Sequence, residues 1–224
     1  MMKTAVFDFD GTIHNTKKLY GRAFRKAYSM LVSEGYAKER DYTDDEVSVY
    51  LGMSAPDMWH SFMPELAKPV MERASMLIGR EMTEGVLSGK AVLYSGIAEV
   101  LTALRSRGIR LMILSNCRHG YMEAHREALG LDKWFDDYFC GEDYGFIPKD
   151  EIFRILMNKY PDSSYIMIGD RASDIDAGIK NGIPAIGCLY GFGSSDELSS
   201  ATALAYSPQD ILSLTEKLFD TNIR

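Results

Sequence analysis

Short apolar runs recur along the chain, and each ends in a polar or glycine-containing turn. The clearest runs are residues 3–8, 110–115 and 165–170, and a weaker copy covers residues 183–190. A continuous apolar run of this length is typical of a strand buried on both faces in a parallel sheet. The carboxyl end of such a strand opens onto a site, so we expect functional residues directly after these runs.

Helical patterns separate the apolar runs. Ile97, Val100, Leu101 and Leu104 recur at helical spacing before Gly108, and residues 152–160 repeat the spacing after Lys149. Ser207-Pro208 opens a last helix with a buried stripe from Ile211 to Leu218. Alternating strands and helices predict an α/β fold with a doubly wound, Rossmann-like parallel sheet. Ligands in such sheets bind beyond the carboxyl ends of the strands.

Residues 15–84 do not fit this alternation, because they show helical patterns and no strand-like run. Tyr20, Phe24, Ala27 and Leu31 share one helical face, and Thr43 to Glu46 form a capping box. A third helical pattern runs from Val70 to an expected end near Gly85. A structureless loop of this length is improbable in a compact protein. We therefore predict an all-α cap domain at 15–84, inserted into an α/β core made of 1–14 and 85–224, with linkers near 14–16 and 84–90.

Composition and charge narrow the classes of partner. The 224 residues are 46% hydrophobic and carry a net charge of -7, which disfavours tight non-specific binding to nucleic acid or an anionic membrane. A phosphorylated metabolite remains compatible with this charge, because one divalent cation can reverse the field inside an acidic site. We expect a small phosphorylated metabolite as partner, no nucleic acid and no membrane, with monomer or homodimer left undecided.

Location is predicted from the thiols and from hydropathy. Cys117, Cys140 and Cys188 are too scattered for a metal knuckle, and an odd number cannot all pair within the chain. Reduced thiols in the cytoplasm are the expected state. Lys3 to Phe9 is too short for a signal peptide, and no apolar stretch approaches the ~20 residues of a membrane helix. We therefore expect a cytoplasmic protein.

The segment Asp8-Phe-Asp-Gly-Thr12 carries the most chemical information. Asp8 and Asp10 are two residues apart, so at the end of a strand both carboxylates can project to the same side. Such a pair requires a cation, and Mg²⁺ suits it because this ion takes few protein oxygens and keeps water or phosphate as its other ligands. Asp8 can then attack phosphorus while Asp10 transfers protons. The alternative is an acidic turn that caps a helix.

Three further segments place polar groups at the expected sheet edge. Ser115-Asn116 ends the second strand and offers neutral donors for phosphate oxygens, although such a pair on its own is usually a turn. Lys149 precedes a helix, where its ammonium can reach a transferring phosphoryl group or simply be solvated. Gly169 to Asp174 bring a second carboxylate pair, Asp170 and Asp174, and Asp174 is equally compatible with helix capping.

With these four segments in order, the sequence resembles the haloacid dehalogenase superfamily of phosphohydrolases. The matching motifs are Asp-x-Asp-Gly-Thr at 8–12, the serine at 115, the lysine at 149 and Gly-Asp-x-x-x-Asp at 169–174. The resemblance implies that Asp8 is the nucleophile and Asp10 the general acid and base. It also implies that Mg²⁺ is held by the Asp8 carboxylate, the Asp10 carbonyl and Asp170, with assistance from Asp174, while Ser115 and Lys149 bind the phosphoryl oxygens.

The resemblance extends to a subgroup and also shows departures. The helical insert is similar to the cap of this superfamily, and residues 183–198 are similar to phosphoglycolate phosphatase-like members. Asp150 follows Lys149 where many relatives have proline, and His14-Asn15-Thr16 replaces a more usual Asp-Ser. We expect His14 to be exposed, with the mouth of the site as the alternative position, and the other histidines to be structural or on the surface. The basic residues from Lys17 to Lys26 are expected to form a solvated face, with contact between one of them and an anionic substrate as the alternative.

The predicted function is a magnesium-dependent phosphatase that acts on small phosphate monoesters such as phosphoglycolate through an aspartyl-phosphate. A phosphosugar mutase is the alternative, but no cation follows Gly52-Met53-Ser54 to hold a second phosphate. A non-catalytic relative would not need the intact Asp8, Asp10, Lys149 and Asp170. We expect the cap to select the substrate through residues 52–56, with Tyr20 and Phe24 as neighbours.

Overall fold

A six-stranded parallel sheet forms the centre of the computed structural model, which describes residues 1–221. The strand order is β3-β2-β1-β4-β5-β6, and every neighbouring pair is parallel. The strands are β1 (Met2–Phe7), β2 (Arg110–Ser115), β3 (Asp137–Cys140), β4 (Ser163–Gly169), β5 (Ala185–Cys188) and β6 (Ala203–Ala205). The α/β class and the four predicted strands are confirmed, whereas β3 and β6 were not predicted.

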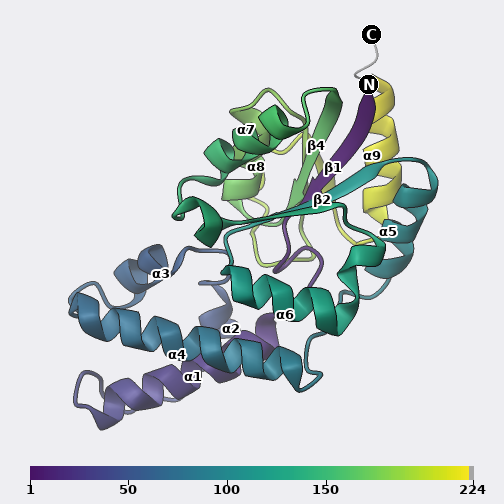
Figure 1. Cartoon of the computed structure of the whole chain (residues 1–224). Helices are drawn as coiled ribbons and strands as arrows, with labels where there is room; N and C mark the ends of the chain where they lie inside the picture. The colour runs from purple at the N-terminus through teal and green to yellow at the C-terminus, as the bar shows by residue number, and fades with distance from the viewer. Residues whose placement is uncertain (222–224) are drawn as a thin grey trace.

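Helices cover both faces of the sheet (Figure 1). Ala5 and Phe7 of β1 share a hydrophobic core with α5 (Ile97–Ser106), α6 (His119–Leu129) and α9 (Asp210–Thr221). Val6 points to the opposite core, with α7 (Lys149–Lys159) and α8 (Ala172–Ile179). Alternate residues of one buried strand therefore hold two helical layers in place. Within residues 1–221, no helix combines the length and apolarity needed to cross a membrane.

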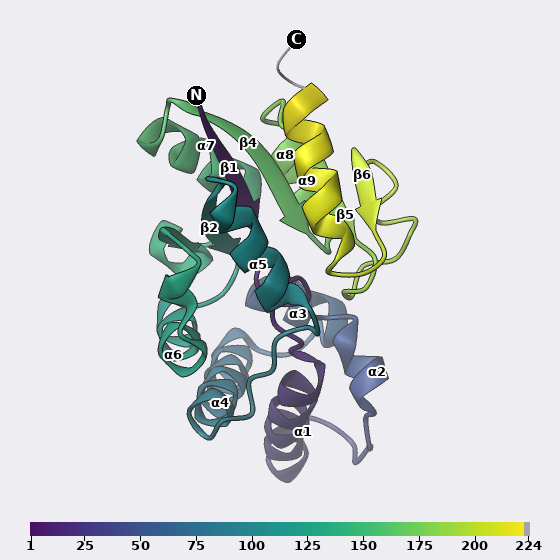
Figure 2. The same cartoon turned by 90° about the vertical axis from the view of Figure 1, so that its right-hand side faces the viewer.

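Four helices lie between β1 and β2 in the chain: α1 (Lys17–Ser33), α2 (Asp44–Ser48), α3 (Ala55–Phe62) and α4 (Lys68–Leu87). Figures 1 and 2 show them gathered beyond the carboxyl end of the sheet, with α4 beside α6. The predicted capping box is present, because Thr43 and Glu46 exchange side-chain and backbone hydrogen bonds at the start of α2. The described residues between β1 and β2 thus form helices and no strand, where the sequence shows helical patterns.

The expected end of the last inserted helix near Gly85 was wrong, because α4 continues to Leu87. A Cβ atom at position 85 would lie 2.1 Å from Cδ1 of Leu19 in α1. This glycine therefore lets α1 and α4 approach closely, and it does not stop the helix. The residues expected to open the second linker, 84–87, are helical.

Phe24 lies at the centre of the aromatic core of the inserted helices. Its ring centroid is 5.0 Å from that of Phe62 and 5.6 Å from that of Tyr42, both in edge-on geometry. Tyr28 stacks on Phe24 and contacts the same two rings. Edge-on and offset aromatic pairs add to the free energy gained by burial. These contacts form the hydrophobic core of the insert, which is continuous with the core on the face of the sheet that α5 covers.

Two isoleucines of α7 allow a matched test of how this helix packs against the sheet. Ile152 is fully buried, whereas Ile155 is 40% exposed on the same helix. We expect Ile152→Ala to lower the free energy of unfolding by about 2–5 kcal/mol, because it removes buried methyl groups and leaves a cavity. Ile155→Ala should cost less than about 1 kcal/mol. Urea unfolding curves measure both values, and equal losses at the two positions would contradict the assigned orientation of α7.

Candidate active site

The loop after β1 folds back on itself so that Asp8 and Asp10 lie at the carboxyl edge of the sheet. The Asp8 N–H donates to the Ile168 carbonyl at 2.8 Å, and the Phe9 carbonyl accepts the N–H groups of Ile13 and His14 at 2.9 Å. Gly11 adopts a φ of +92°, and a Cβ atom there would lie 2.2 Å from Asp170. Only glycine fits such a turn against the neighbouring strand end. The strand order reverses on either side of β1, which is where doubly wound sheets bind ligands.

Asp8, Asp170 and Asp174 form a buried carboxylate cluster with Lys149. One oxygen from each of the three carboxylates lies within 4.8 Å of the others. The Lys149 ammonium donates to Asp8 Oδ1 at 2.7 Å and to Asp174 Oδ1 at 2.5 Å. All four side chains are nearly inaccessible to solvent. The structure therefore brings together four predicted residues that are up to 166 positions apart in the chain.

The cluster holds more negative than positive charge, and the pKa values reflect this imbalance. Burial raises the pKa of Asp8 from 3.8 to about 7, despite the opposing effect of Lys149. Burial and the charges of Asp8 and Asp174 raise the pKa of Asp170 well above its usual range. Burial alone would lower the pKa of Lys149, but the charges of Asp174 and Asp8 have the larger effect and raise it. A divalent cation with oxygen ligands would neutralise the excess charge, so the donor set fits Mg²⁺.

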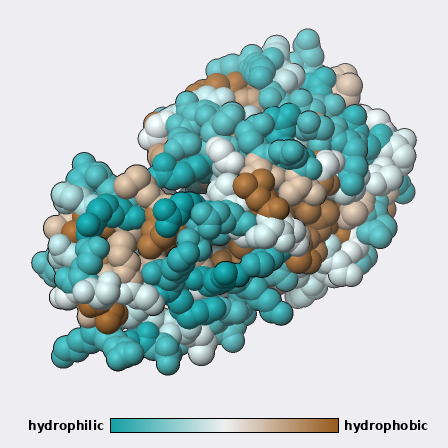
Figure 3. Space-filling model, turned by 60° about the horizontal axis from the view of Figure 1, so that its bottom comes forward, coloured by the Kyte–Doolittle hydropathy of each residue, from teal (hydrophilic) through white to brown (hydrophobic). Residues whose placement is uncertain are grey.

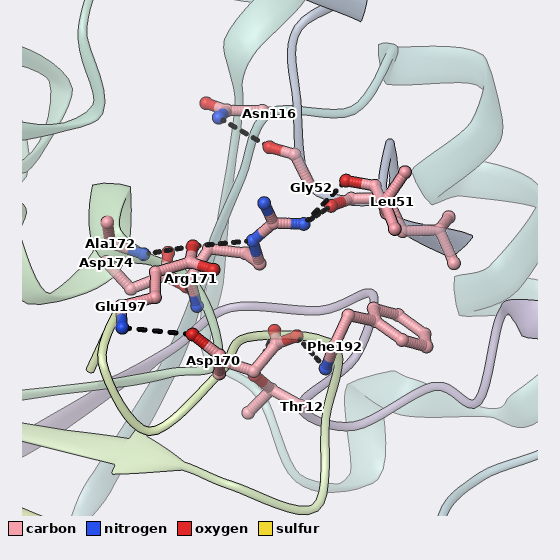
Figure 4. Close-up of polar contacts among 12 residues, drawn as sticks. Thr12, Leu51, Gly52, Asn116, Asp170, Arg171, Ala172, Asp174, Phe192 and Glu197 are labelled. Carbon is pink, nitrogen blue, oxygen red and sulfur yellow. Dashed lines mark hydrogen bonds and ion pairs between the residues drawn. The ribbon is translucent and has the colours of Figure 1, made fainter. Parts of the chain in front are cut away.

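The neighbours of Asp170 hold its carboxylate in one orientation (Figure 4). Thr12 donates its hydroxyl proton to Asp170 Oδ1 at 3.1 Å, and the Phe192 N–H donates to Oδ2 at 2.8 Å. Thr12, a candidate catalytic residue of the first motif that offers a hydroxyl and an N–H, therefore positions Asp170 through its hydroxyl. Asp174 accepts the Arg171 N–H at 2.9 Å, so it caps α8 and belongs to the carboxylate cluster at once.

Asp10 lies outside the carboxylate cluster, in a hydrogen-bonded group of its own. Its Oδ1 atom accepts the hydroxyl protons of Thr16 at 2.5 Å and Tyr121 at 2.9 Å, and it lies 2.9 Å from His14 Nδ1. Burial alone would raise the pKa of Asp10, but the contacts with His14 and Thr16 lower it. The structure thus gives the two carboxyl groups of the first motif opposite pKa shifts, which is a common arrangement in acid–base sites.

The expectation that His14 is exposed was wrong. Its side chain is completely buried, and its ring stacks against Phe9 and meets the His125 ring at a centroid distance of 4.5 Å. Burial, together with His14, lowers the pKa of His125 to about 4. His125 thus stays neutral at physiological pH, and the charge next to Asp10 does not include it.

A cavity of about 580 Å³ connects the two groups of carboxylates with the inserted helices. Ser115, Asn116 and Lys149 line its core end, as predicted, and Tyr20 and Met53 line its other wall. Phe24 was expected beside Tyr20, but it is 1% exposed within the aromatic core and does not line the cavity. Figure 3 shows a narrow hollow between two masses of the molecule, with hydrophobic groups near it.

Cys117 also lines the cavity but is not activated. The hydrogen bond from the Cys117 thiol to Cys140, together with burial, raises the pKa of this thiol well above the ordinary value. A reactive cysteine needs the reverse shift. The prediction that nothing marks Cys117 as a nucleophile agrees with this environment.

Sequence reasoning missed the contacts that join the core to the inserted helices (Figure 4). The Arg171 guanidinium donates to the carbonyls of Leu51 and Val49, and Glu197 holds it in place at 2.8 Å. Asn116 Nδ2 donates to the Gly52 carbonyl at 3.5 Å. These contacts fix the position of residues 49–52 over the site. No sequence motif identifies them, because their acceptors are backbone carbonyls and any residue provides one.

The doubly wound parallel sheet, with a buried aspartate cluster at its switch point, defines the structural class of this protein. The haloacid dehalogenase-like hydrolase family model matches residues 5–188. The chain therefore belongs to the haloacid dehalogenase-like hydrolases, and the predicted family and enzyme class are confirmed.

Named relatives match the chain along most of its length. It is 25% identical over 224 residues to a phosphorylated carbohydrates phosphatase of Thermotoga maritima, covering 97% of this chain and 100% of that one. It is 28% identical over 199 residues to a phosphoglycolate phosphatase of Agrobacterium fabrum, covering 84% and 81%. A predicted phosphatase from Clostridium acetobutylicum has the same fold, with a TM-score of 0.83, 21% identity and coverage of 98% and 99%.

The raised pKa of Asp8 has a consequence for stability in metal-free solution. A folded-state pKa above the unfolded value contributes stability at low pH, and this contribution is lost as the pH rises through about 7. Asp8→Asn removes the charge, so we expect the variant to be more stable than the wild type at pH 8. The advantage should shrink by up to about 1.4 kcal/mol for each pH unit between 7 and 5.

Thermal unfolding in excess chelator at pH 8 and pH 5 measures this difference. Each kcal/mol corresponds to roughly 2–4 °C in a chain of this size. Asp176→Asn is the matched control, because Asp176 lies in α8 and its side chain is 55% exposed. An Asp8→Asn variant with the same stability difference from wild type at both pH values would contradict the raised pKa.

Proposed function

We propose that this hydrolase is a magnesium-dependent phosphatase that cleaves small phosphate monoesters through an aspartyl-phosphate on Asp8. The convergence of Asp8, Lys149, Asp170 and Asp174 at the end of β1 carries the proposal. Three buried carboxylates around one ammonium make a poor structural core, but they suit a site that receives a cation and a phosphoryl group. The phosphatase names of relatives that match most of the chain support the same reaction.

In the proposed reaction, a carboxylate oxygen of Asp8 attacks phosphorus, and the bond from phosphorus to the leaving oxygen breaks. Asp10 gives a proton to the departing alkoxide and later takes one from the water that attacks the aspartyl-phosphate. Inorganic phosphate and free Asp8 result. Thr16 and Tyr121 favour the ionised form of Asp10, which is the form required in the second step. His14 Nδ1 lies 2.9 Å from the same carboxylate oxygen and helps to hold Asp10 in place.

The remaining core residues bind and orient the phosphoryl group. Ser115 and Asn116 offer neutral donors at the end of β2, and Lys149 offers an ammonium. The Asp8 carboxylate, the Asp10 carbonyl and Asp170 would hold Mg²⁺, with Asp174 assisting. The ion would supply positive charge that stabilises the transferring phosphoryl group. Thr12 and Phe192 keep Asp170 oriented toward this position.

We also propose that residues 15–84 act as a cap over a core of residues 1–14 and 85–224. Tyr20, Met53 and Ala55 line the cavity opposite the carboxylates, so closure would exclude water during transfer. Arg171 and Asn116 hold residues 49–52 in the arrangement described here, and release of these bonds would open the site. The free thiols of Cys117, Cys140 and Cys188 support a cytoplasmic location.

The nucleophile is tested by removing its charge. Asp8→Asn should lower turnover of p-nitrophenyl phosphate by at least about a thousandfold, because catalytic units fail nearly completely when one member is lost. Asp10→Asn should slow turnover less for this good leaving group. Asp176→Asn, on the exposed side of α8, is the control and should leave turnover unchanged. More than about a tenth of wild-type turnover in Asp8→Asn would exclude a covalent route through this residue.

The metal requirement is tested by chelation. Excess chelator should abolish activity, Mg²⁺ should restore it, and Ca²⁺ should not, because its larger and looser ligand shell suits the transfer geometry poorly. Asp170→Ala should raise the Mg²⁺ concentration needed for half-maximal activity by about tenfold or more, because substitutions at metal sites lower metal affinity by factors of this order. Full activity in excess chelator would rule out the proposed metal site.

A further inference from the structure

The cavity wall that faces the carboxylates is largely apolar, although Ser75, Arg80, Thr83 and Glu84 also line it. The inserted segment supplies aromatic and thioether side chains to this wall: Tyr20, Tyr50, Met53, Met58, Met76 and Met82. Methionine side chains are flexible and polarizable, so they adapt to organic groups of different shapes. The cavity volume of about 580 Å³ lies within the ~300–1,000 Å³ usual for sites that enclose organic ligands. There is room beyond the phosphoryl end for a leaving group much larger than a two-carbon acid.

The cations that line the cavity are all paired with carboxylates in the part of the chain that the structure describes. The pairs are Lys149 with Asp8 at 2.7 Å, Arg118 with Glu142 at 2.8 Å, Arg171 with Glu197 at 2.8 Å, and Arg80 with Glu84 at 3.8 Å. Arg171 is further occupied by the carbonyls of residues 49 and 51. A second negative group on a substrate would therefore have to displace a close partner at Lys149, Arg118 or Arg171, whereas the Arg80–Glu84 pair is long, with both side chains more than half exposed.

The basic residues of α1 do not supply a substitute. Lys17 pairs with Asp45 and Lys26 with Glu81, both within the inserted segment, and neither lysine lines the cavity. Arg25 pairs with Asp44 at 2.8 Å and also lies outside the cavity lining. None of the basic residues from Lys17 to Lys26 lines the cavity, which agrees with the expected solvated face.

The charge around the cavity disfavours any leaving group with its own negative charge. Asp8, Asp10, Glu84, Glu142 and Asp174 line the cavity together with the four cations, and the bound cation of the proposed function would compensate charge at the phosphoryl end alone. An extra carboxylate placed against the methionine wall would lose water without gaining a partner, which is costly. An uncharged leaving group would bury apolar surface there at no such cost.

We infer that the preferred substrates are phosphate monoesters of uncharged alcohols with a bulky apolar or aromatic part, and not phosphoglycolate or pyrophosphate. This inference rests on the proposed phosphatase function and names the substrate class of the same site. Phosphoglycolate carries a carboxylate next to the transferred group, so this chain should differ in selectivity from relatives that carry that name.

Matched pairs of esters test the inference on the intact protein with Mg²⁺. Benzyl phosphate and 4-carboxybenzyl phosphate differ by one carboxylate. In the second pair, 2-hydroxyethyl phosphate and phosphoglycolate, the leaving groups are smaller and again only one of them carries a carboxylate. We expect kcat/KM to favour the uncharged member of each pair by about tenfold or more, since each factor of ten reflects ~1.4 kcal/mol of transition-state binding. Benzyl phosphate should also exceed 2-hydroxyethyl phosphate.

Two lysine variants of α4 assign the discrimination to the cavity wall. Met76 lines the cavity and is 59% exposed, whereas Leu87 lies outside the lining and is 67% exposed. Met76→Lys should shift the kcat/KM ratio toward 4-carboxybenzyl phosphate by about tenfold, because it supplies the missing cation. Leu87→Lys adds the same charge elsewhere on the helix and should leave the ratio unchanged. Met53→Lys provides a second variant if Met76→Lys does not fold.

The outcomes separate this inference from the proposed function. Equal or better turnover of the carboxylated esters by the wild type would overturn the inferred substrate class while leaving the phosphatase function intact. A ratio that does not move in Met76→Lys or Met53→Lys, with both variants folded, would also overturn it. Lack of Mg²⁺-dependent turnover of every ester, including p-nitrophenyl phosphate, would instead reject the proposed function on which the inference rests.

Discussion

The burial of Lys149 between Asp8 and Asp174 is the contact on which the organisation of the site depends. Its ammonium lies 2.7 and 2.5 Å from the two carboxylates, in a place from which solvent is nearly excluded. An unpaired charge at that depth would be strongly destabilising, so the three side chains constrain one another. The three side chains also join separate parts of the chain, since Asp8 follows β1, Lys149 begins α7 and Asp174 lies in the first turn of α8.

One ammonium does not balance all the negative charge of the site. Asp170 adds a third buried carboxylate, and the pKa values of Asp8 and Asp170 are raised as a result. Natural proteins tolerate such an imbalance where function requires it, because the arriving ligands complete the charge. The proposed Mg²⁺ and phosphoryl group have complementary charges, and together they would give every buried group a partner.

The sequence predicted what depends on local pattern. The strands β1, β2, β4 and β5 appear as apolar runs, and the parallel topology places their polar ends at one edge, so the meeting of Asp8, Ser115 and Asp170 could be expected. The strands β3 and β6 are only four and three residues long, too short for a clear pattern. The family resemblance added residue roles that spacing alone left open.

What depends on tertiary contact was not predictable. His14 was expected to be exposed, yet the fold-back of the loop after Phe9 buries it against Asp10. Tyr121 reaches the same carboxylate from a helix 111 positions away, and no motif surrounds it. Phe24 and Tyr20 share one helical face, but only Tyr20 lines the cavity, because the rings of Tyr50, which follows α2, and Phe62 of α3 cover Phe24. The arrangement of helices, and not periodicity, decides which apolar residues line a cavity.

In the proposed function, the edge of the sheet carries out the phosphoryl chemistry and the inserted helices contact the rest of the substrate. The central claim is covalent: the phosphoryl group passes through the carboxylate of Asp8. Borohydride added during turnover reduces an acyl phosphate, and it would convert a phosphorylated Asp8 into homoserine. Peptide mass spectrometry should find this conversion at position 8, dependent on substrate and Mg²⁺. Rapid phosphate release with an unmodified Asp8, or with the modification on another residue, would contradict the account.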